Sequence, residues 1–204
     1  MNLLIDRLPS EVTVGGVEFK IRSDFRTSIL FEQLMFDSTI EDNEKIALAL
    51  ELYYSDEISR INNANIDEAI EKMLWFFTGG KEKEGSTKKT SSNIKRVYDY
   101  EYDDDYIYSA FMTQYGIDLN RIKYLHWWKF RALFNCLKED NEIVKIMQYR
   151  GVNLTKIKDK EERKRYAKLK EIYKLPVQVD KDEKERLEAI KKALANNGDI
   201  SNLL

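Results

Sequence analysis

Three carboxylates near the middle of the chain come closest to the types and spacing that metal binding needs. Asp99, Glu101 and Asp103 match the first, third and fifth positions of a calcium-binding loop. Such a loop needs glycine at its sixth position and glutamate at its twelfth, but this sequence has Asp104 and Ala110 there. The calcium signature therefore fails, and we interpret the run as a solvated acidic edge.

One histidine and one cysteine are the other candidates for chemistry. A single histidine cannot form the histidine pair of a zinc or iron site, and a single cysteine excludes an intramolecular disulfide framework. Neither lies in a nucleophile motif, so we expect His126 to pack on an apolar helix face and Cys136 to be a small buried hydrophobe. The glycine pairs at 15–16 and 79–80 lack the GK[ST] of a phosphate loop. We therefore predict a non-enzymatic protein with no catalytic, cofactor-binding or metal-binding residue.

The stretch from Val97 to Leu137 is the densest in large rings and holds two of the three tryptophans. Aromatic residues dominate both protein cores and interfaces, so a core or a docking surface is expected here. Tyrosines and acidic residues alternate at the start of this stretch, which we call the acidic–aromatic entry. Our candidate partner-binding residues come from it and are Tyr98, Tyr100, Tyr102, Asp103, Asp104, Asp105 and Tyr106. The alternative is an ordinary helix start, where carboxylates meet free backbone amides and the positive end of the helix dipole.

Composition predicts the elements that position these residues. The chain has 204 residues, of which 43% are hydrophobic and 34% charged, with only two prolines and eight glycines. This balance is typical of helices with solvated outer faces. We expect a mainly α fold, a compact domain of about six to eight helices.

An N-terminal β-hairpin is expected at residues 11–21, which read EVTVGGVEFKI. Alternating apolar residues flank a Gly-Gly pair, which supplies the positive φ angles of a tight turn. Such a ribbon is marginal alone and must pack on helices or on another chain.

Capping residues and apolar spacing predict the helices. The expected segments run from 23 or 24 to 36, from 42 or 43 onward, over 66–78, 106–115 and 118–137, from 141 or 142 to 150, and over 155–175 and 180–196. In the segment 118–137, Asp118 would be the cap, and one stripe would hold Ile122, Leu125, His126, Phe130, Leu133 and Leu137. Trp127 and Trp128 widen this apolar surface, so we expect neighbours to surround the helix.

Residues 81–93 contain no apolar side chain, so we expect a mobile loop there. Residues 1–176 would then form a single mostly helical domain, and residues 177–204 a C-terminal helix with a frayed tail. The start of the chain lacks the pattern of a signal peptide, and no stretch is apolar enough to span a membrane.

Charge is unevenly distributed although the formal net charge is only −2. Residues 1–80 carry 7 basic and 15 acidic side chains, whereas residues 155–179 carry 9 basic and 4 acidic ones. This asymmetry predicts complementarity within the molecule or toward a partner. The basic segment also leaves open a nucleic-acid-binding regulatory protein, although glutamates between the basic residues argue against it.

Several segments together resemble the bacteriophage gene-product-fifteen family. They are the hairpin that leads to DFR at Asp24–Arg26, the runs DDDYIYSAFMTQYGIDL and HWWKFRALFNCL, and IMQYRG followed by IKDKEERKRYAKLKEIYKLP. The resemblance spans about residues 3 to 176, with HWWKF and KDKEERKRY its most specific parts.

The resemblance implies a small protein of tailed phages and prophages of Gram-positive bacteria. Family genes commonly lie between those of the major tail protein and the tape-measure protein, the position of tail assembly chaperones. The expected function is therefore to cover the tape-measure protein and/or the major tail protein in the host cytoplasm before the tail tube polymerises. A structural component of the virion tail or connector is the alternative, and self-association is a further possibility. The resemblance brings no catalytic residue.

Overall fold

The structure is a computed structural model that describes residues 2–80 and 96–176. The elements in these ranges are β1 (Glu11–Val14), β2 (Val17–Lys20), α1 (Phe25–Phe36), α2 (Asp42–Tyr54), the 3-10 helix η1 (Ser55–Arg60), α3 (Ile66–Phe77), α4 (Asp104–Tyr115), α5 (Trp127–Asn135), α6 (Glu142–Gly151), the 3-10 helix η2 (Leu154–Lys156) and α7 (Lys160–Ile172). The predicted mainly α fold with an N-terminal hairpin is confirmed. No helix in these ranges is long and apolar enough to cross a membrane.

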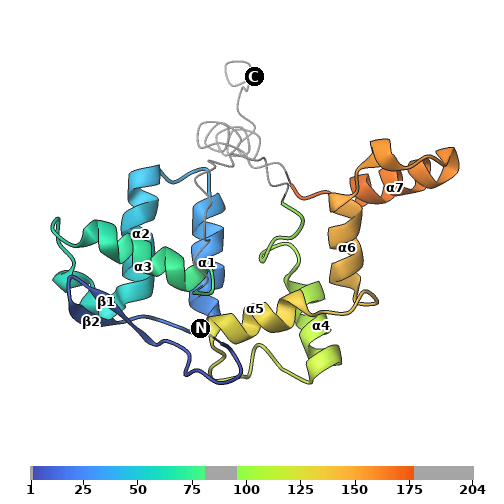
Figure 1. Ribbon diagram of the computed structural model, residues 1–204. Coiled ribbons are helices and arrows are strands. Elements are labelled where there is room, and N and C mark those ends of the chain that lie inside the picture. Colours follow the sequence, from blue (N-terminus) through green and yellow to red (C-terminus); the bar gives the residue numbers. More distant parts are fainter. Residues whose placement is uncertain (1, 81–95, 177–204) are drawn as a thin grey trace, which may run out of the picture.

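The elements form two groups (Figure 1). The hairpin and α1–α3 lie together, α4, α6 and α7 lie together, and α5 runs between the groups. The loop expected at 81–93 and the helix expected at 180–196 lie outside the described residues. The division into one domain and a C-terminal tail stays a prediction.

The hairpin forms as predicted. Val14 pairs with Val17, so Gly15 and Gly16 are the two turn residues, with φ angles of 59° and 77°. A two-residue turn with both φ angles positive matches the twist of the flanking strands. Val12, Val14 and Phe19 are buried, and β1 contacts α3, so the ribbon is stabilised by a helix of its own chain.

Two separate reasons require glycine at the two positions after α3. Gly79 and Gly80 have φ angles of 89° and 68°, the left-handed region that favours glycine after a helix. A Cβ atom on Gly80 would also lie 2.3 Å from the Trp128 ring, and one on Gly79 would lie 2.5 Å from the guanidinium of Arg131. The end of α3 can therefore approach α5 closely only without side chains at these positions.

The predicted helix over 118–137 is wrong in its first half. Only Trp127–Asn135 is helical, as α5, and residues 117–126 form a loop with a turn. The Asp118 carboxylate does accept hydrogen bonds from the amides of Asn120 and Arg121, at 3.0 and 3.1 Å. It caps a local turn that does not continue as a helix.

Tertiary hydrogen bonds explain why α5 begins late. The amide of Phe25 donates to the carbonyl of Leu125 at 2.9 Å, and the amide of Trp127 donates to the carbonyl of Ser23 at 2.8 Å. The amide of Leu125 donates to the Asp24 carboxylate at 3.1 Å. These groups pair with a segment distant in sequence, so they are not available for a helical ladder before residue 127.

Phe130 on α5 joins the two groups of elements. It is fully buried, and its ring stacks on Phe25 of α1 and on Phe111 of α4, each with a centroid distance of 4.9 Å. Trp127 and Phe134 stack along the same helix at 5.7 and 6.2 Å. One ring thus packs on rings from both sides, and stacked pairs stabilise beyond their area alone.

The tryptophans belong to the core, as predicted. Trp127 and Trp128 are 2% and 6% exposed. Their Nε1 atoms donate to the carbonyls of Phe77 and Phe76, at 2.8 and 2.7 Å. The last carbonyls of a helix have no partner within it, so both indoles also satisfy the end of α3.

The helix predicted at 155–175 begins later than expected. The sequence places its start at Thr155, but α7 begins at Lys160, after Asp159 accepts the amide of Glu162 at 2.7 Å. Thr155 lies in η2, where the Asn153 side chain accepts its amide at 3.0 Å. Asp159 followed by two glutamates is the stronger start, because all three lie at the positive end of the helix dipole.

Candidate partner-binding surface

The structure divides the seven residues of the acidic–aromatic entry into an inner and an exposed set. The inner set is Tyr98, which is half-buried, with Tyr100 and Asp103, which are 7% and 1% exposed. The exposed set is Tyr102, Asp104, Asp105 and Tyr106. Partner binding by these residues stays a prediction, and only the exposed set can contact a partner without rearrangement.

Asp103 is held inside the protein by Arg150 of α6. The guanidinium donates to both carboxylate oxygens, with Nη2 to Oδ1 at 2.9 Å, and Arg150 itself is only 7% exposed. Arg150 also donates to the carbonyls of Val97 and Tyr173, and Asp103 accepts the amide of Asp99 at 2.8 Å. This pair therefore ties together α4, α6, the end of α7 and the entry.

The interpretation of this run as a solvated acidic edge is wrong for Asp99 and Asp103, whereas Glu101 is exposed. Asp99 is 5% exposed, pairs with Arg96 at 2.7 Å, and accepts the amide of Glu101 at 2.7 Å. Asp99 and Asp103 are buried because each binds an arginine and backbone amides, which offsets the cost of desolvation. Within the described ranges, no group of three or more metal-ligand side chains is placed to hold an ion.

Tyr98 and Tyr100 pack against α5. The Tyr98 ring lies 5.1 Å from Phe134 and 5.2 Å from Tyr100, and its hydroxyl donates to the Glu32 carboxylate at 3.5 Å. Burial and, to a smaller extent, the nearby Glu32 carboxylate together raise the pKa of Tyr98 to about 12. Burial also raises the pKa of Glu32, against the opposing effects of Tyr98 and Arg96. These rings belong to the packing of the fold.

A groove of about 610 Å³ opens beside the exposed set. Its lining comes from α1, from Tyr100, from the first turns of α4, from the loop at 118–121 and from Phe130 of α5. The apolar and aromatic residues of this lining are Phe25, Ile29, Tyr100, Ile107, Tyr108, Leu119 and Phe130. Its acidic residues are Asp104, Asp105 and Asp118. We call this site the acidic groove.

The two arginines of the acidic groove are bound by the protein itself. Arg26 pairs with Asp24 at 3.1 Å and donates to the carbonyls of Leu119 and Ile122, at 2.8 and 2.9 Å. Arg121 is highly exposed and lies 3.6 Å from Asp118. The charge of Arg26 thus serves to fix the loop that forms one wall.

Asp104 and Asp105 supply the free negative charge of the acidic groove. Across residues 2–80 and 96–176 neither carboxylate takes part in an ion pair, and both are exposed in the first turn of α4. The positive end of the helix dipole favours them there. Apolar walls with carboxylates at the edge suit an apolar segment that carries basic side chains.

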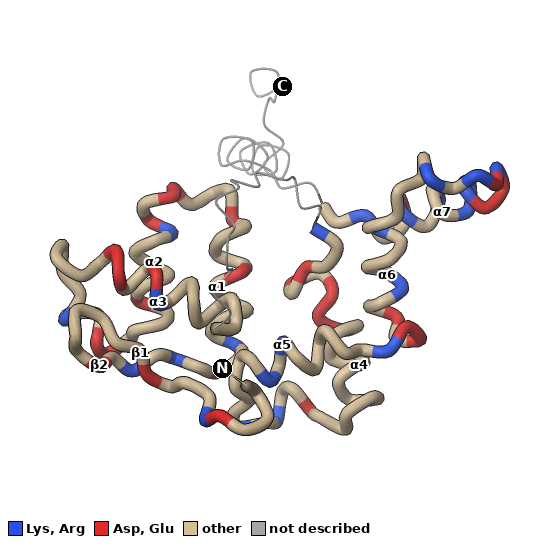
Figure 2. Tube along the Cα trace, in the orientation of Figure 1, with Lys and Arg blue, Asp and Glu red and all other residues tan. Residues whose placement is uncertain are grey.

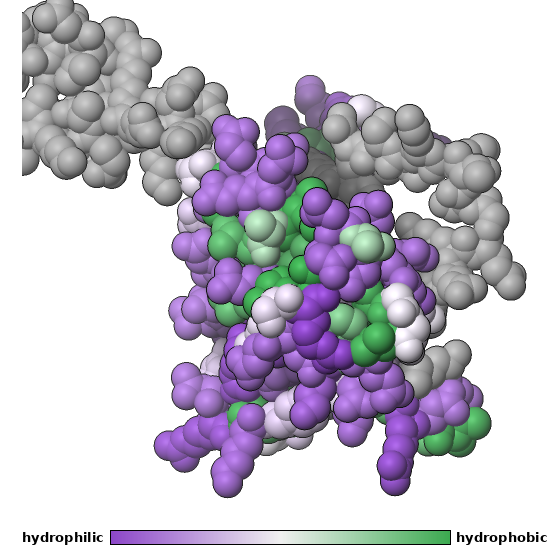
Figure 3. Space-filling view, turned by 90° about the vertical axis from the view of Figure 1, so that its left-hand side faces the viewer, coloured by the Kyte–Doolittle hydropathy of each residue, from purple (hydrophilic) through white to green (hydrophobic). Residues whose placement is uncertain are grey.

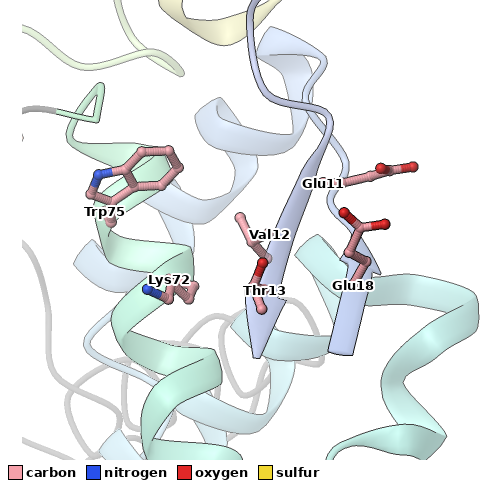
Figure 4. Close-up of a pocket in the computed structure, with 6 residues that line it drawn as sticks. All are labelled: Glu11, Val12, Thr13, Glu18, Lys72 and Trp75. Atoms are coloured by element: carbon pink, nitrogen blue, oxygen red, sulfur yellow. The ribbon is translucent and has the colours of Figure 1, made fainter. Parts of the chain in front are cut away.

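A second, smaller groove of about 250 Å³ lies between α3 and the hairpin (Figure 4). Lys72 and Trp75 of α3 lie on the side of β1 that carries Val12 and Thr13, whereas Glu11 and Glu18 lie toward the other side of the hairpin. The Trp75 ring packs edge-on against Trp128 at 5.5 Å, so its position serves the core. This groove has fewer apolar walls and mixed charge, which makes it the weaker candidate.

His126 is buried, as expected, but its place differs from the prediction. It is the N-cap of α5: its Nδ1 accepts the amide of Trp128 at 3.0 Å, so Nε2 carries the proton and donates to the carbonyl of Pro9 at 3.0 Å. Burial and nearby Lys129 lower the pKa of His126, against the opposing bond to Pro9. The prediction that Cys136 is buried is wrong, because this residue is exposed at the end of α5.

Sequence reasoning missed the two arginines that organise the site. Arg150 precedes a helix-ending glycine and Arg26 lies in a first helical turn, where basic residues are usually solvated. Arg26 falls within the DFR motif, whereas no spacing marks Arg150 as the partner of Asp103. Asp103 lies 47 residues from Arg150, and the two carbonyls that Arg26 binds lie 93 and 96 residues from it, beyond the reach of any local pattern.

Comparison with known protein families shows the family of this chain. Residues 4–175 match the family model described as Bacteriophage Gp15 protein. The chain belongs to the bacteriophage Gp15 protein family. The resemblance found in the sequence is thus confirmed over nearly the same range. Membership of the Gp15 family indicates a phage protein with a structural or assembly-related function. No curated protein and no solved structure matches this Gp15 chain.

Proposed function

We propose that this protein is a phage tail assembly chaperone, which covers apolar segments of the tape-measure protein and/or the major tail protein before the tail tube polymerises. Membership of the Gp15 family supports a role in phage structure or assembly. The observation that carries the proposal is the acidic groove, with aromatic walls and the exposed carboxylates of Asp104 and Asp105, which form no ion pair within residues 2–80 and 96–176.

The groove suits the proposed task physically. A long helical chain with exposed apolar stripes, as expected of a tape-measure protein, aggregates unless another protein covers those stripes. An amphipathic helix binds by laying its apolar face into a groove, and carboxylates at the edge favour basic residues beside that face. A groove of about 610 Å³ covers a short segment, so many copies would bind along one chain. The protein would act without catalysis, in the cytoplasm of the host.

Coexpression tests the proposal. With the tape-measure protein or the major tail protein of its own phage, this protein should raise the soluble yield of that chain and copurify with it in several copies. Binding should survive moderate salt, because burial of apolar area is not screened. Failure to bind either protein would remove the support for a chaperone.

Variants of the groove locate the contact. Tyr108→Ala and the double change Asp104→Lys with Asp105→Lys should each reduce copurification, because Tyr108 lines the groove and the two carboxylates supply its charge. Glu139→Lys with Asp140→Lys is the matched control, since both are exposed carboxylates outside the groove. Equal binding by all variants would place the contact elsewhere.

Purified particles separate the chaperone from the structural alternative. A chaperone must leave before the tube closes around the tape measure, so mature virions should lack the protein. Stoichiometric recovery from purified tails would instead support a structural component of the tail or connector.

A further inference from the structure

A row of lysines runs along the outer side of α7. Lys160, Lys164 and Lys168 are each four residues apart, which places them on one face of a helix, and all three are exposed. Figure 2 shows many Lys and Arg positions along this helix at one end of the molecule, with acidic positions among them. Glu161 pairs with Lys164 at 2.9 Å, but both are largely exposed, so water screens the pair and the row remains attractive to anions.

An acidic row lies on the outer side of α2. Glu44 and Glu51 are exposed seven residues apart, and Leu48, which is 37% exposed, lies between them. Lys45 turns away from this row, because its ammonium donates to the Met35 carbonyl at 3.3 Å and lies 3.9 Å from Asp42. The row thus carries two carboxylates with an apolar side chain between them.

The two rows match in spacing and in apolar character. With a rise of about 1.5 Å per residue, Glu44 and Glu51 are about 10 Å apart along their helix, and Lys160 and Lys168 about 12 Å apart along theirs. Exposed apolar side chains accompany both rows: Leu48 on α2 and, on α7, Ile172, which is 61% exposed. Figure 3 views the molecule from the end with α2, α3 and the hairpin, where apolar areas lie among hydrophilic side chains.

The rows cannot meet within one molecule. α2 and α7 lie at opposite ends of the structure, with α5 between their groups (Figure 1). We propose that the lysine row on α7 of one copy docks onto the acidic row on α2 of a second copy. Such a head-to-tail contact leaves one row free on each outer copy, so it generates open chains or rings rather than closed dimers.

Charge balance favours a second copy over a foreign partner. The molecule carries both surfaces itself, with 15 acidic against 7 basic residues in 1–80 and 9 basic against 4 acidic residues in 155–179. A polyanion would bind the lysine row but would leave the acidic row unexplained. No residue of α7 is buried, and Tyr149 holds the helix by contacts with Tyr166 and Tyr173, so its outer face is available.

This inference goes beyond the proposed chaperone, because it concerns the protein alone. Sedimentation velocity of the purified full chain, at rising concentration and at about 0.1 M salt, should show masses above the 24.2 kDa of one copy. At about 1 M salt, where the Debye length falls to about 3 Å, the masses should return toward one copy. A wild-type chain that stays at 24.2 kDa throughout at low salt overturns the proposal.

Charge reversal identifies the two rows. Glu44→Lys with Glu51→Lys, and Lys160→Glu with Lys168→Glu, should each abolish the association. Both changes in α7 suit the helix, since glutamate is favoured at its start and can pair with Lys164 from residue 168. An equimolar mixture of the two variants should associate again, because each then finds an opposite charge on the other. Absence of rescue, with helical content unchanged by circular dichroism, contradicts the proposed pairing.

A matched control separates local contact from net charge. Lys123→Glu with Lys138→Glu changes the charge by the same amount at exposed lysines outside both rows, and it should associate like the wild type. Binding to duplex DNA tests the alternative. If the wild type is monomeric and is retained on DNA, and if Lys160→Glu with Lys168→Glu abolishes this retention, self-association is overturned in favour of nucleic-acid binding. Tail-protein copurification is a separate measurement, so failure of either proposal can be recognised by itself.

Discussion

The two groups of elements are held together by different kinds of interaction. Around α1, α3 and α5, large rings stack on one another, with Phe130 and Trp127 fully or nearly fully buried. Around α4, α6 and the end of α7, Phe111, Ile143 and Ile146 are buried as well, and a buried ion pair between Asp103 and Arg150 joins the segments in addition. The first group is thus packed mainly by rings, whereas the second combines apolar burial with directional bonds to one guanidinium.

The two groups should therefore respond differently to substitutions. Burial of apolar area is non-directional, so the aromatic group should accept changes of shape and lose stability in proportion to the volume removed. A buried ion pair is worth little compared with apolar packing, but removal of one partner leaves an uncompensated charge. The Asp103–Arg150 pair therefore fixes the position of the acidic–aromatic entry. It thereby also places the carboxylates of Asp104 and Asp105 in the lining of the acidic groove.

The largest expected effect is in the aromatic group. Trp127→Ala should lower the free energy of unfolding by about 4 to 5 kcal/mol, since it removes a buried ring and leaves a cavity. Urea denaturation measures the loss, and Trp127→Phe serves as the control that keeps most of the ring but loses the bond to the Phe77 carbonyl. If Trp127→Ala and Trp128→Ala both melt like the parent, these rings are not the core.

The ion pair should produce the next largest effect. Arg150→Met should lower the free energy of unfolding by about 3 to 4 kcal/mol, because the Asp103 carboxylate is then buried without its arginine, with the Asp99 amide still donating to it. Changing both residues, Arg150→Met with Asp103→Leu, should recover much of the loss. A double variant that is as unstable as the sum of the two single ones would contradict the assigned role of the pair.

The glycine pairs provide a smaller, matched comparison. Gly80→Ala should cost about 2 to 3 kcal/mol, because the residue has a positive φ and its Cβ would meet the Trp128 ring at 2.3 Å. Gly16→Ala should cost only about 1 to 2 kcal/mol, because its φ is also positive but nothing lies within 4 Å of the Cβ. Thermal or urea unfolding of both variants measures the difference, which reports the close contact of α3 with α5. Equal losses would mean that this contact can relax.

The smallest effect concerns pH. Burial keeps the pKa of His126 below its usual value of 6.5, so the unfolded chain binds the proton more readily. Its contribution to stability is therefore present above about pH 6.5 and is lost as the pH falls below that value. Protonation would also remove the acceptor that caps α5, a bond worth about 1 kcal/mol. His126→Asn keeps an acceptor without titrating, so it should remove this part of the pH dependence of urea midpoints.

The candidate site was predictable only in part. Tyr102, Asp104, Asp105 and Tyr106 lie exposed at the start of α4, near where the alternating pattern placed them. The same pattern could not separate them from Asp103, because the difference is an arginine 47 residues away. The groove itself needs α1 and the loop at 118–121 as walls, and the sequence predicted that loop to be helical.

Local physical chemistry fixed the features that need no distant partner. Gly15 and Gly16 specify a two-residue turn, Gly116 ends α4 with a φ of 65°, and the apolar spacing places α1, α3 and α6. Tertiary structure decided the start of α5, the burial of Asp99 and Asp103, and the function of His126 as a cap. The physical reason is the range of the forces: turns and helix ends are satisfied by neighbours in sequence, whereas a buried charge or an extended backbone depends on donors that only the fold brings close.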